Sequence, residues 1–283
     1  MFMAPWFLGL FVLTAGPMLA SLYLSLTDFD LLTLPSFVGF DNYVTMLTED
    51  PRFIQSLTVT LIYVVLSVPF QLTFALLLAL ALNRGLRGLS FYRAIFYVPS
   101  LLGSSVAIAI VWRQVFGQEG LFNAGLAMVS LDGRDWISTP DTALYTLVAL
   151  SVWQFGSPMI IFLAGLRQIP QEQYEAAELD GAGSMTRFFR ITLPLLSPII
   201  FFNIVLQIIQ SFQAFTSAFI VSGGTGGPSD STLFYTLYLY IEGFGSFRMG
   251  YAAAMAWVLV LIIGVFSAAN FLASRHWVFY ADN

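Results

Sequence analysis

The segment EAAELDGAGSMTRFFRITLPLLSP, Glu175–Pro198, belongs to a compact charged stretch in a chain that is otherwise strongly apolar. Seven charged residues fall between Arg167 and Arg190, and long stretches without any charge lie on both sides. A charged side chain costs about 2.5–3.5 kcal/mol at the centre of a membrane helix. The stretch therefore lies outside the bilayer, and it separates the apolar segments around it.

These apolar segments indicate an integral membrane protein. The chain has 283 residues, of which 58% are hydrophobic and 10% charged, and its mean hydropathy is +0.81. A spanning helix needs roughly 20 apolar residues. Six charge-free windows reach or approach this length: Met1–Thr27, Phe53–Asn83, Ala94–Trp112, Thr142–Leu166, Ile191–Ser229 and Met249–Ser274. The sequence predicts an all-α polytopic protein with six transmembrane helices, in one domain of residues 1–283.

Two of the windows need interpretation. The fifth ends in SGGTGGPS, Ser222–Ser229, which is loop chemistry, so we expect its helix to run from about Ser197 to Val221. The first lacks a basic leader and is apolar over too great a length for a signal peptide, so it is interpreted as a genuine span.

The arginines predict the orientation of the spans. With both termini in the cytoplasm, seven of the eleven arginines fall on the inner side and four on the outer side. The inner set is Arg84, Arg87, Arg93, Arg167, Arg187, Arg190 and Arg275. This arrangement obeys the positive-inside rule, whereas the reverse arrangement breaks it. The charged stretch is therefore expected in the cytoplasm, between the fourth and fifth spans.

The composition excludes several kinds of chemistry. Cysteine and lysine are both absent, which removes disulfides, thiolate sites, Schiff bases and the phosphate-binding lysine of a P-loop. The single histidine, His276, lies near the C-terminus and is interpreted as an interfacial residue. No basic patch suggests nucleic acid. The charge-free windows argue against proton coupling and against an intramembrane protease, and we predict no catalytic and no metal-binding residue.

The charged stretch has its own helical pattern. Strong helix formers occupy Gln171–Leu179 directly after Pro170, as at a helix start. Gly181 and Gly183 then break the helix, and a second short amphipathic segment follows through Phe188–Ile191. The pattern predicts a helix–turn–helix that lies across one membrane face. An ordinary solvated loop with helical propensity is the alternative.

The spacing of the stretch resembles a known family. Glu175-Ala176-Ala177 is followed after three residues by Gly181, then after nine by Ile191, and after one more by Leu193-Pro194. This resembles the cytoplasmic EAA loop of permease subunits in binding-protein-dependent ABC importers, here within residues 167–196. The resemblance implies a type I importer fold and a coupling helix that docks on an ATPase subunit. It assigns that role to Glu175, Ala176, Ala177, Asp180 and Gly181, while two separate ATP-binding subunits hold ATP and magnesium.

Other segments resemble carbohydrate permeases of the first type, as in glycerol-phosphate, multiple-sugar and maltose systems. They are FVGFDNYVTML (37–47), GLFNAGL (120–126), GGTGGPSDSTLFYTLYLYIEGF (223–244), MGYAAAMAWVLVLI (249–262) and RHWVFY (275–280). The resemblance implies sugar import with a second permease, an extracytoplasmic solute-binding protein and a bacterial or archaeal plasma membrane. The glycines of Gly223–Gly227 suit a flexible outer turn that touches the binding protein. A six-helix channel and a non-sugar solute remain as alternatives.

A row of amides marks a candidate substrate path on the fifth span. On a helix, Asn203, Gln207, Gln210 and Gln213 fall within about 120° of one another. Amides suit hydroxyl-rich, uncharged sugars because they both donate and accept hydrogen bonds. Hydrogen bonding between helices is the alternative role. Trp153 and Gln154 on the fourth span are further candidates, and Gln71 ranks after them.

Overall fold

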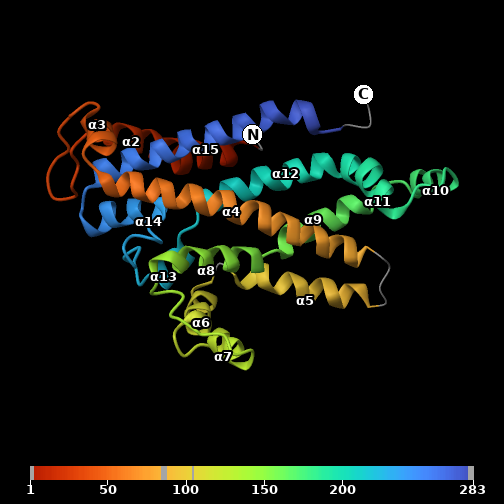
Figure 1. Cartoon of the computed structure of the whole chain (residues 1–283). Helices are drawn as coiled ribbons and strands as arrows, with labels where there is room; N and C mark the ends of the chain where they lie inside the picture. The colour runs from red at the N-terminus through yellow and green to blue at the C-terminus, as the bar shows by residue number, and fades with distance from the viewer. Residues whose placement is uncertain (1–2, 84–87, 104, 280–283) are drawn as a thin grey trace.

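A computed structural model describes residues 3–83, 88–103 and 105–279. These residues form a bundle of long helices whose loops gather at two opposite ends (Figure 1). Within the described ranges, the only β pairing is an isolated bridge between Thr27 and Phe37. The predicted all-α fold is confirmed.

Four helices in the described ranges are long and apolar enough to cross a membrane, and two bent helix pairs raise the number to six. The four are Ala4–Leu24, Pro51–Leu82, Ser184–Val221 and Met249–Trp277. They comprise α1 (Ala4–Gly9), η1 (Leu10–Ala15), α2 (Gly16–Leu24), α4 (Pro51–Leu82), α11 (Ser184–Arg187), η2 (Phe188–Thr192), α12 (Leu193–Phe212), α13 (Thr216–Val221) and α15 (Met249–Trp277).

Helix α4 is the centre of the bundle. It packs against α8 (Pro140–Trp153), α9 (Gly156–Leu166), α12 and α14 (Tyr235–Tyr240). Its buried face includes Ala75 and Ala79, and such small side chains allow helices to approach closely. Gly165 has the same effect on α9, because a Cβ there would meet Ile199 and Leu196 of α12. This contact surface holds the second, fourth and fifth spans together.

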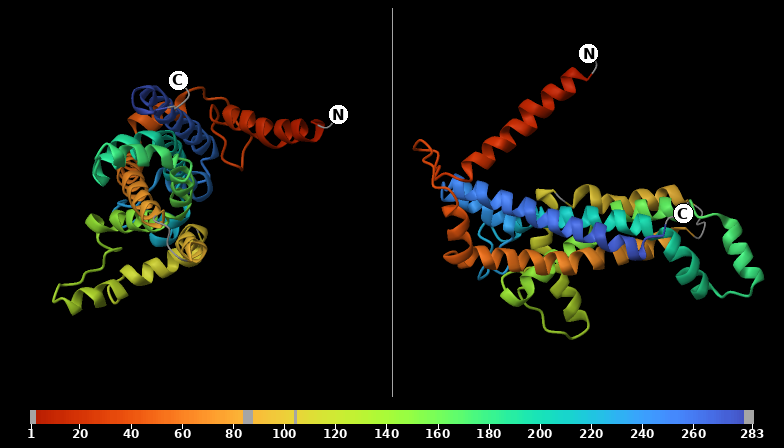
Figure 2. Two further views of the ribbon diagram at one scale, coloured as in Figure 1. Left: turned by 90° about the vertical axis from the view of Figure 1, so that its right-hand side faces the viewer. Right: turned by 90° about the horizontal axis from the view of Figure 1, so that it is seen from above.

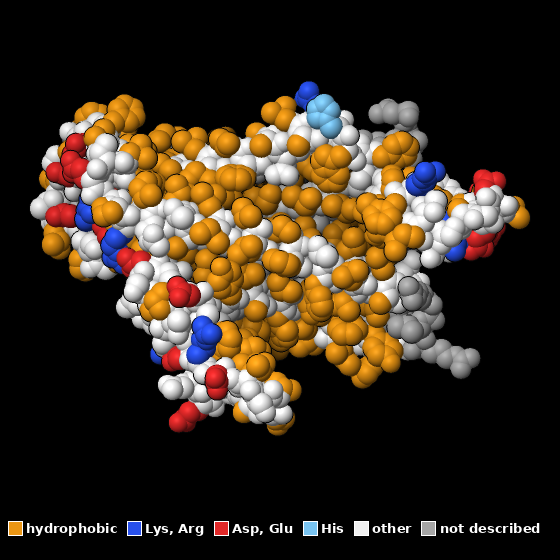
Figure 3. Space-filling view, viewed as in Figure 1, with side chains coloured by type: hydrophobic (Ala, Val, Ile, Leu, Met, Phe, Trp, Pro, Cys, Tyr) orange, Lys and Arg blue, Asp and Glu red, His pale blue; other side chains and the backbone are white. Residues whose placement is uncertain are grey.

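The loops sort to the two ends as the sequence predicts. One end carries α3 (Asp41–Thr48), α13, α14 and η3 (Ile241–Gly245), and the other carries α10 (Gln171–Leu179) and the end of α15 (Figure 1). Figure 3 shows acidic side chains gathered at both ends and a mainly hydrophobic face between them. The arrangement is that of a multi-pass membrane protein. Arg84 and Arg87, which entered the orientation prediction, lie outside the described residues.

The third window does not form the predicted continuous span. Helix α5 (Leu89–Leu102) and helix α6 (Val106–Phe116) meet at an angle of 93°. Pro99 removes a helical donor, and the Ser105 hydroxyl caps α6 by accepting from the Ile108 N–H at 3.3 Å. Helix α6 and the following α7 (Leu121–Met128) therefore turn away from the bundle axis (Figure 1).

The fifth span begins earlier than predicted. Its helix starts at Ser184, instead of near Ser197, and continues to Val221 with a short break after Phe212. Pro194 follows the π-helical turn η2, where the regular α-helical bonding is already interrupted, so it does not separate the amphipathic segment from the span. The predicted helix–turn–helix is therefore α10, a turn, and the extended start of the fifth span.

The first span touches the bundle only weakly, through the contact of α2 with α15. No residue of α1, η1 or α2 is buried, although large apolar side chains cover the helix. Figure 2 shows that it leaves the bundle at the α3 end and runs obliquely away. Apart from the contact of α2 with α15, the described chain leaves the apolar surface of this helix uncovered.

Candidate functional site

A polar cavity of about 380 Å³ lies where three spans are broken. The breaks fall at Gly103 after α5, at Gln154 after α8 and at Gln213 after α12. Irregular backbone is tolerated at membrane depth only where protein buries it or where it lines a cavity. The cavity is lined by Tyr63, Gln71, Gly103, Ser151, Gln154, Gln207, Gln210, Ser211, Gln213, Ala214, Phe215, Thr216 and Ser217. This lining contains no charged residue.

Four of the six predicted path residues meet at this cavity. Gln207 is buried at its wall, Gln210 and Gln213 are exposed in the isolated chain, and Gln154 joins them from the fourth span. These amides offer donors and acceptors to a neutral solute. Within the described part of the chain, the side-chain amides of these three fifth-span glutamines form no hydrogen bond with the protein, so they can bind a ligand.

The other two predicted path residues do not line the cavity. Asn203 is 1% exposed, and its Nδ2 donates to the Ile199 carbonyl of its own helix at 3.2 Å. The Trp153 ring packs with its centroid 6.0 Å from that of Trp112. Gln71, which the sequence ranked last, lines the cavity and donates through Nε2 to the Gln154 carbonyl at 3.0 Å.

Helix α10, for which the resemblance predicts a coupling role, has the predicted bounds and a well-defined end. Helix α10 ends in a Schellman motif, in which the Ala182 N–H donates to the Ala177 carbonyl at 2.9 Å and the Gly181 N–H to the Glu178 carbonyl at 3.0 Å. Gly181 has a φ of +77°, in the left-handed region. This conformation strongly favours glycine and turns the chain back toward the bundle.

Two side-chain contacts hold α10 against the start of the fifth span. The Tyr174 hydroxyl lies 2.9 Å from the Thr192 hydroxyl, and Glu178 pairs with Arg187. Glu175, Ala176 and Asp180 remain exposed, while Ala177 is half-buried. Leu179 is 90% exposed at the helix end, which sequence reasoning missed. An anchored helix with a free face of this kind suits docking of another subunit.

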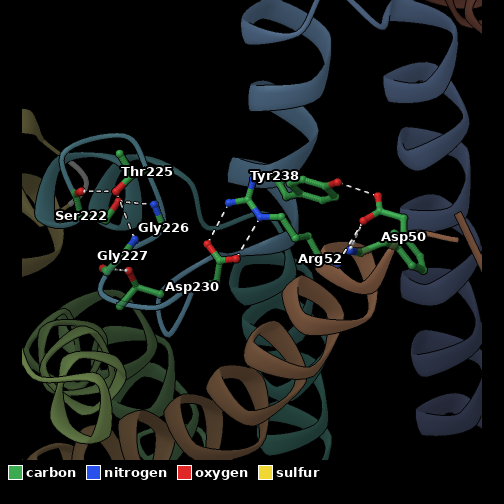
Figure 4. Close-up of polar contacts among 10 residues, drawn as sticks. Asp50, Arg52, Ser222, Thr225, Gly226, Gly227, Asp230 and Tyr238 are labelled. Carbon is green, nitrogen blue, oxygen red and sulfur yellow. Dashed lines mark hydrogen bonds and ion pairs between the residues drawn. The ribbon is translucent and has the colours of Figure 1, made fainter.

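The end of the bundle opposite α10 is organised by an acidic cap and an ion pair (Figure 4). Asp50 caps α4 and accepts from the hydroxyls of Tyr238 at 2.5 Å and Tyr251 at 2.6 Å. Partial burial of Asp50 raises its pKa, but the tyrosine and backbone hydrogen bonds outweigh burial, so the pKa lies below its ordinary value. Arg52 forms a bidentate salt bridge with Asp230, in which its Nη2 and Nε donate to the two carboxylate oxygens at 2.8 and 2.9 Å.

The glycine-rich turn, for which flexibility is predicted, is folded by hydrogen bonds of its own side chains. The Gly226 N–H donates to the Ser222 hydroxyl at 3.1 Å, and the Thr232 hydroxyl donates to the Gly227 carbonyl at 2.8 Å. A Cβ on Gly226 would meet Leu233 Cα at 2.8 Å, so the turn packs closely. Asp230 ties its end to α4 through Arg52 (Figure 4).

Replacing Asp50 with Ala is expected to destabilise this end of the bundle. The change removes a helix cap worth about 0.5–2 kcal/mol and leaves two buried tyrosine hydroxyls without their acceptor, at about 1–3 kcal/mol each. Thermal unfolding in detergent should show a clear fall in Tm, whereas Ala at the exposed Asp132 should not change it. An equal Tm for both variants contradicts the role of Asp50.

The same cap predicts a pH dependence. Because the folded pKa of Asp50 is lowered, its contribution is complete above the unfolded pKa of about 3.9 and is lost as the pH falls through the folded value. The Tm difference between the native chain and Asp50→Ala should therefore shrink below about pH 4. A difference that is constant from pH 7 to pH 3 contradicts this assignment.

Comparison with known proteins gives consistent matches. Residues 43–276 match the family model described as binding-protein-dependent transport system inner membrane component. The chain is 51% identical over 280 residues to the probable ABC transporter permease protein YesP of Bacillus subtilis, covering 99% of this chain and 91% of YesP. It is 35% identical to the lactose transport system permease protein LacF of Rhizobium radiobacter, covering 97% and 93% of the two chains.

A solved structure shares the fold. It is a bacterial alginate ABC transporter in complex with an alginate pentasaccharide-bound periplasmic protein, and it matches with a TM-score of 0.84 at 22% identity, covering 97% of this chain and 92% of that one. Together with the sequence matches, it confirms the resemblance that the Glu175–Pro194 spacing predicts.

Proposed function

This chain belongs to the family of binding-protein-dependent transport system inner membrane components, and we propose that it forms half of the translocation path of an ATP-driven sugar importer. It is a permease subunit and carries no ATPase chemistry of its own. The importer works with a solute-binding protein outside the membrane. In this proposal the chain lies in a bacterial or archaeal plasma membrane with both termini in the cytoplasm.

The uncharged, amide-rich cavity is the observation that carries the sugar assignment. Gln207, Gln210 and Gln213 face it from the fifth span, and Gln154 faces it from the fourth. A neutral, hydroxyl-rich solute can exchange its hydrogen bonds with water for bonds to these amides without burying a charge. The names of LacF and of the alginate transporter, which refer to saccharides, support the same substrate class.

The exposed face of α10 supports the coupling role. ATP and magnesium bind on two separate ATPase subunits, each of which docks a permease at its coupling helix. Glu175 and Asp180 offer carboxylates to basic groups of that partner, and Ala176 allows close approach. ATP binding closes the ATPases and draws the coupling helices together, which opens the path outward. Hydrolysis restores the inward-facing state.

The open side of the cavity and the first span support a second permease as a partner. Gln210 and Gln213 are exposed in the isolated chain, so the cavity is incomplete on that side. No residue of the apolar helix Ala4–Leu24 is buried by the described chain. A second, different permease would close the cavity and cover part of this helix. The glycine-rich turn and the network around Asp50 lie at the outer end, where the solute-binding protein docks.

Affinity purification of the chain from its native host in mild detergent, followed by mass spectrometry, tests this assignment. We expect one second permease and two ATPase subunits for each copy of the chain. The solute-binding protein recovered with them can then be screened against neutral sugars. A chain that comes out alone, or only with copies of itself, contradicts the importer assignment and favours a channel.

A further inference from the structure

At its break, the fourth span contains a backbone carbonyl that has no helical N–H donor. Helix α8 ends at Trp153, α9 begins at Gly156, and the two are bent by 41°. Pro158 stands four residues after Gln154 and has no N–H, so it cannot donate to the Gln154 carbonyl as a helix would require. In a membrane segment, such a carbonyl needs another partner.

Side chains from two neighbouring spans supply the missing bonds. Gln71 Nε2 of α4 donates to the Gln154 carbonyl at 3.0 Å, and the Ser100 hydroxyl of α5 donates to it at 2.8 Å. The Ser100 hydroxyl also accepts from the Ser157 N–H at 2.9 Å. We call Gln71, Ser100, Gln154 and Ser157 the polar knot. These hydrogen bonds hold the end of α8 and the start of α9 together, although the helix is not continuous between them.

The knot also joins the breaks of the third and fourth spans. Gln154 Nε2 donates to the Gly103 carbonyl, at the end of α5, at 3.2 Å. Gly156 packs directly on α5, because a Cβ there would lie 2.6 Å from the Phe96 carbonyl oxygen and 2.9 Å from Tyr97 Cα. The first turn of α9 therefore rests on the backbone of α5 at one close point of contact.

Helix α9 connects this point to the coupling helix. Its 11 residues, Gly156–Leu166, span roughly 16 Å at 1.5 Å per residue, and α10 begins five residues later at Gln171. We call residues Gly156–Leu179 the coupling arm. Helix α9 packs against α4 and α12, so a displacement of α10 by a partner would reach the break through this packed helix. At the break, no continuous ladder of helical hydrogen bonds resists bending.

We propose that the break at Gln154 is the pivot of the coupling arm, and that Gln71 and Ser100 are positioning residues that set its angle. This inference rests on the proposed importer function. Gln71, Gly103, Ser151 and Gln154 also line the polar cavity. A sugar hydroxyl that bonds to one of these groups competes with a hydrogen bond of the polar knot. Sugar in the cavity therefore changes how strongly the break resists bending.

Paired variants separate a positioning role from a sugar contact. Ser100 does not line the cavity, so Ser100→Ala removes knot bonds without removing a cavity group. In the reconstituted complex, we expect Ser100→Ala to raise the ATP hydrolysed per sugar imported by about fivefold, the effect of one hydrogen bond, with little change in KM for the sugar. Gln71→Met should raise the same ratio together with KM, because Gln71 also lines the cavity. Gln213→Met, which removes an amide from the same cavity, should instead raise KM at an unchanged ratio.

Unchanged ATP-to-sugar ratios in both knot variants, or a change in KM alone, would overturn the proposal. A distance measurement covers the case in which these variants fail to assemble. Because the chain has no cysteine of its own, a thiol-reactive spin label attaches only at the two introduced residues, Tyr145→Cys on α8 and Gln168→Cys after α9. We expect their separation to change between the nucleotide-free and ATP-bound complex. Sugar uptake with an unchanged separation refutes the pivot alone, whereas absence of ATP-driven uptake by the native complex refutes the proposed function.

Discussion

Replacing Gly181 with Val is expected to uncouple ATP hydrolysis from sugar import. Gly181 has a φ of +77°, where a residue with a Cβ is strained by about 1–2 kcal/mol and a β-branched side chain fits poorly. Relief of that strain would break the Schellman motif and reorient α10 against its ATPase partner. We predict a fall in sugar import of roughly 5- to 30-fold, the equivalent of that strain, while ATP hydrolysis continues.

Gly183 provides a matched control two residues away. Its φ is −67° and no atom lies within 4 Å of the position of a Cβ, so Val fits there without strain. Gly183→Val should import sugar at nearly the native rate, with both variants inserted in the membrane at similar levels. Normal import by Gly181→Val, or equal loss in both variants, would refute the role of the left-handed turn.

Changing Gln207 and Gln210 together to Leu is expected to weaken substrate recognition. Both amides line the polar cavity, and each hydrogen bond to a neutral hydroxyl contributes about 0.5–1.5 kcal/mol. Loss of two such bonds should raise the apparent KM for the sugar about tenfold. The measurement is the concentration dependence of uptake with saturating binding protein, in proteoliposomes that contain the purified complex.

Asn203 offers a matched control on the same helix. It is buried outside the cavity and bonds to its own helix, so Asn203→Leu removes an amide without removing a cavity group. Its apparent KM should stay close to the native value. If Gln207→Leu with Gln210→Leu leaves KM unchanged, these amides are packing groups. If Asn203→Leu raises KM equally, the sugar site is not confined to the cavity.

Local chemistry was enough to predict the coupling helix. Pro170 and the helix formers after it predict a start at Gln171, and Gly181 predicts the end, in agreement with α10 at Gln171–Leu179. Helix signals of this kind act over a few residues and are visible in a single sequence. The contact between Tyr174 and Thr192 was not predictable, because it depends on the path of the chain after the turn.

The breaks that shape the cavity were not predicted. A hydropathy window counts apolar residues and does not register the hydrogen bond that Pro158 or Pro99 removes, so the third and fourth windows read as continuous spans. A proline alone is not a sufficient signal, since Pro69 lies inside the unbroken helix α4. The role of Gln71 had no local signal, since its partner Gln154 lies 83 residues along the chain.

The row of amides on the fifth span predicted part of the cavity lining correctly. Helical spacing correctly grouped Gln207, Gln210 and Gln213 on one face, because α12 is regular up to Phe212. The same spacing included Asn203, which lies one turn deeper, against neighbouring helices. Periodicity gives the direction of a side chain around a helix, whereas the level of the cavity along the axis depends on breaks in other spans.

Uptake of a labelled sugar by proteoliposomes tests the central claim most directly. The vesicles contain the complex purified through this chain, with ATP and magnesium enclosed and the cognate binding protein outside. The account predicts sugar accumulation against its gradient that stops when either ATP or the binding protein is left out. Uptake that runs only down the gradient and needs neither component would contradict it and would identify the chain as a channel.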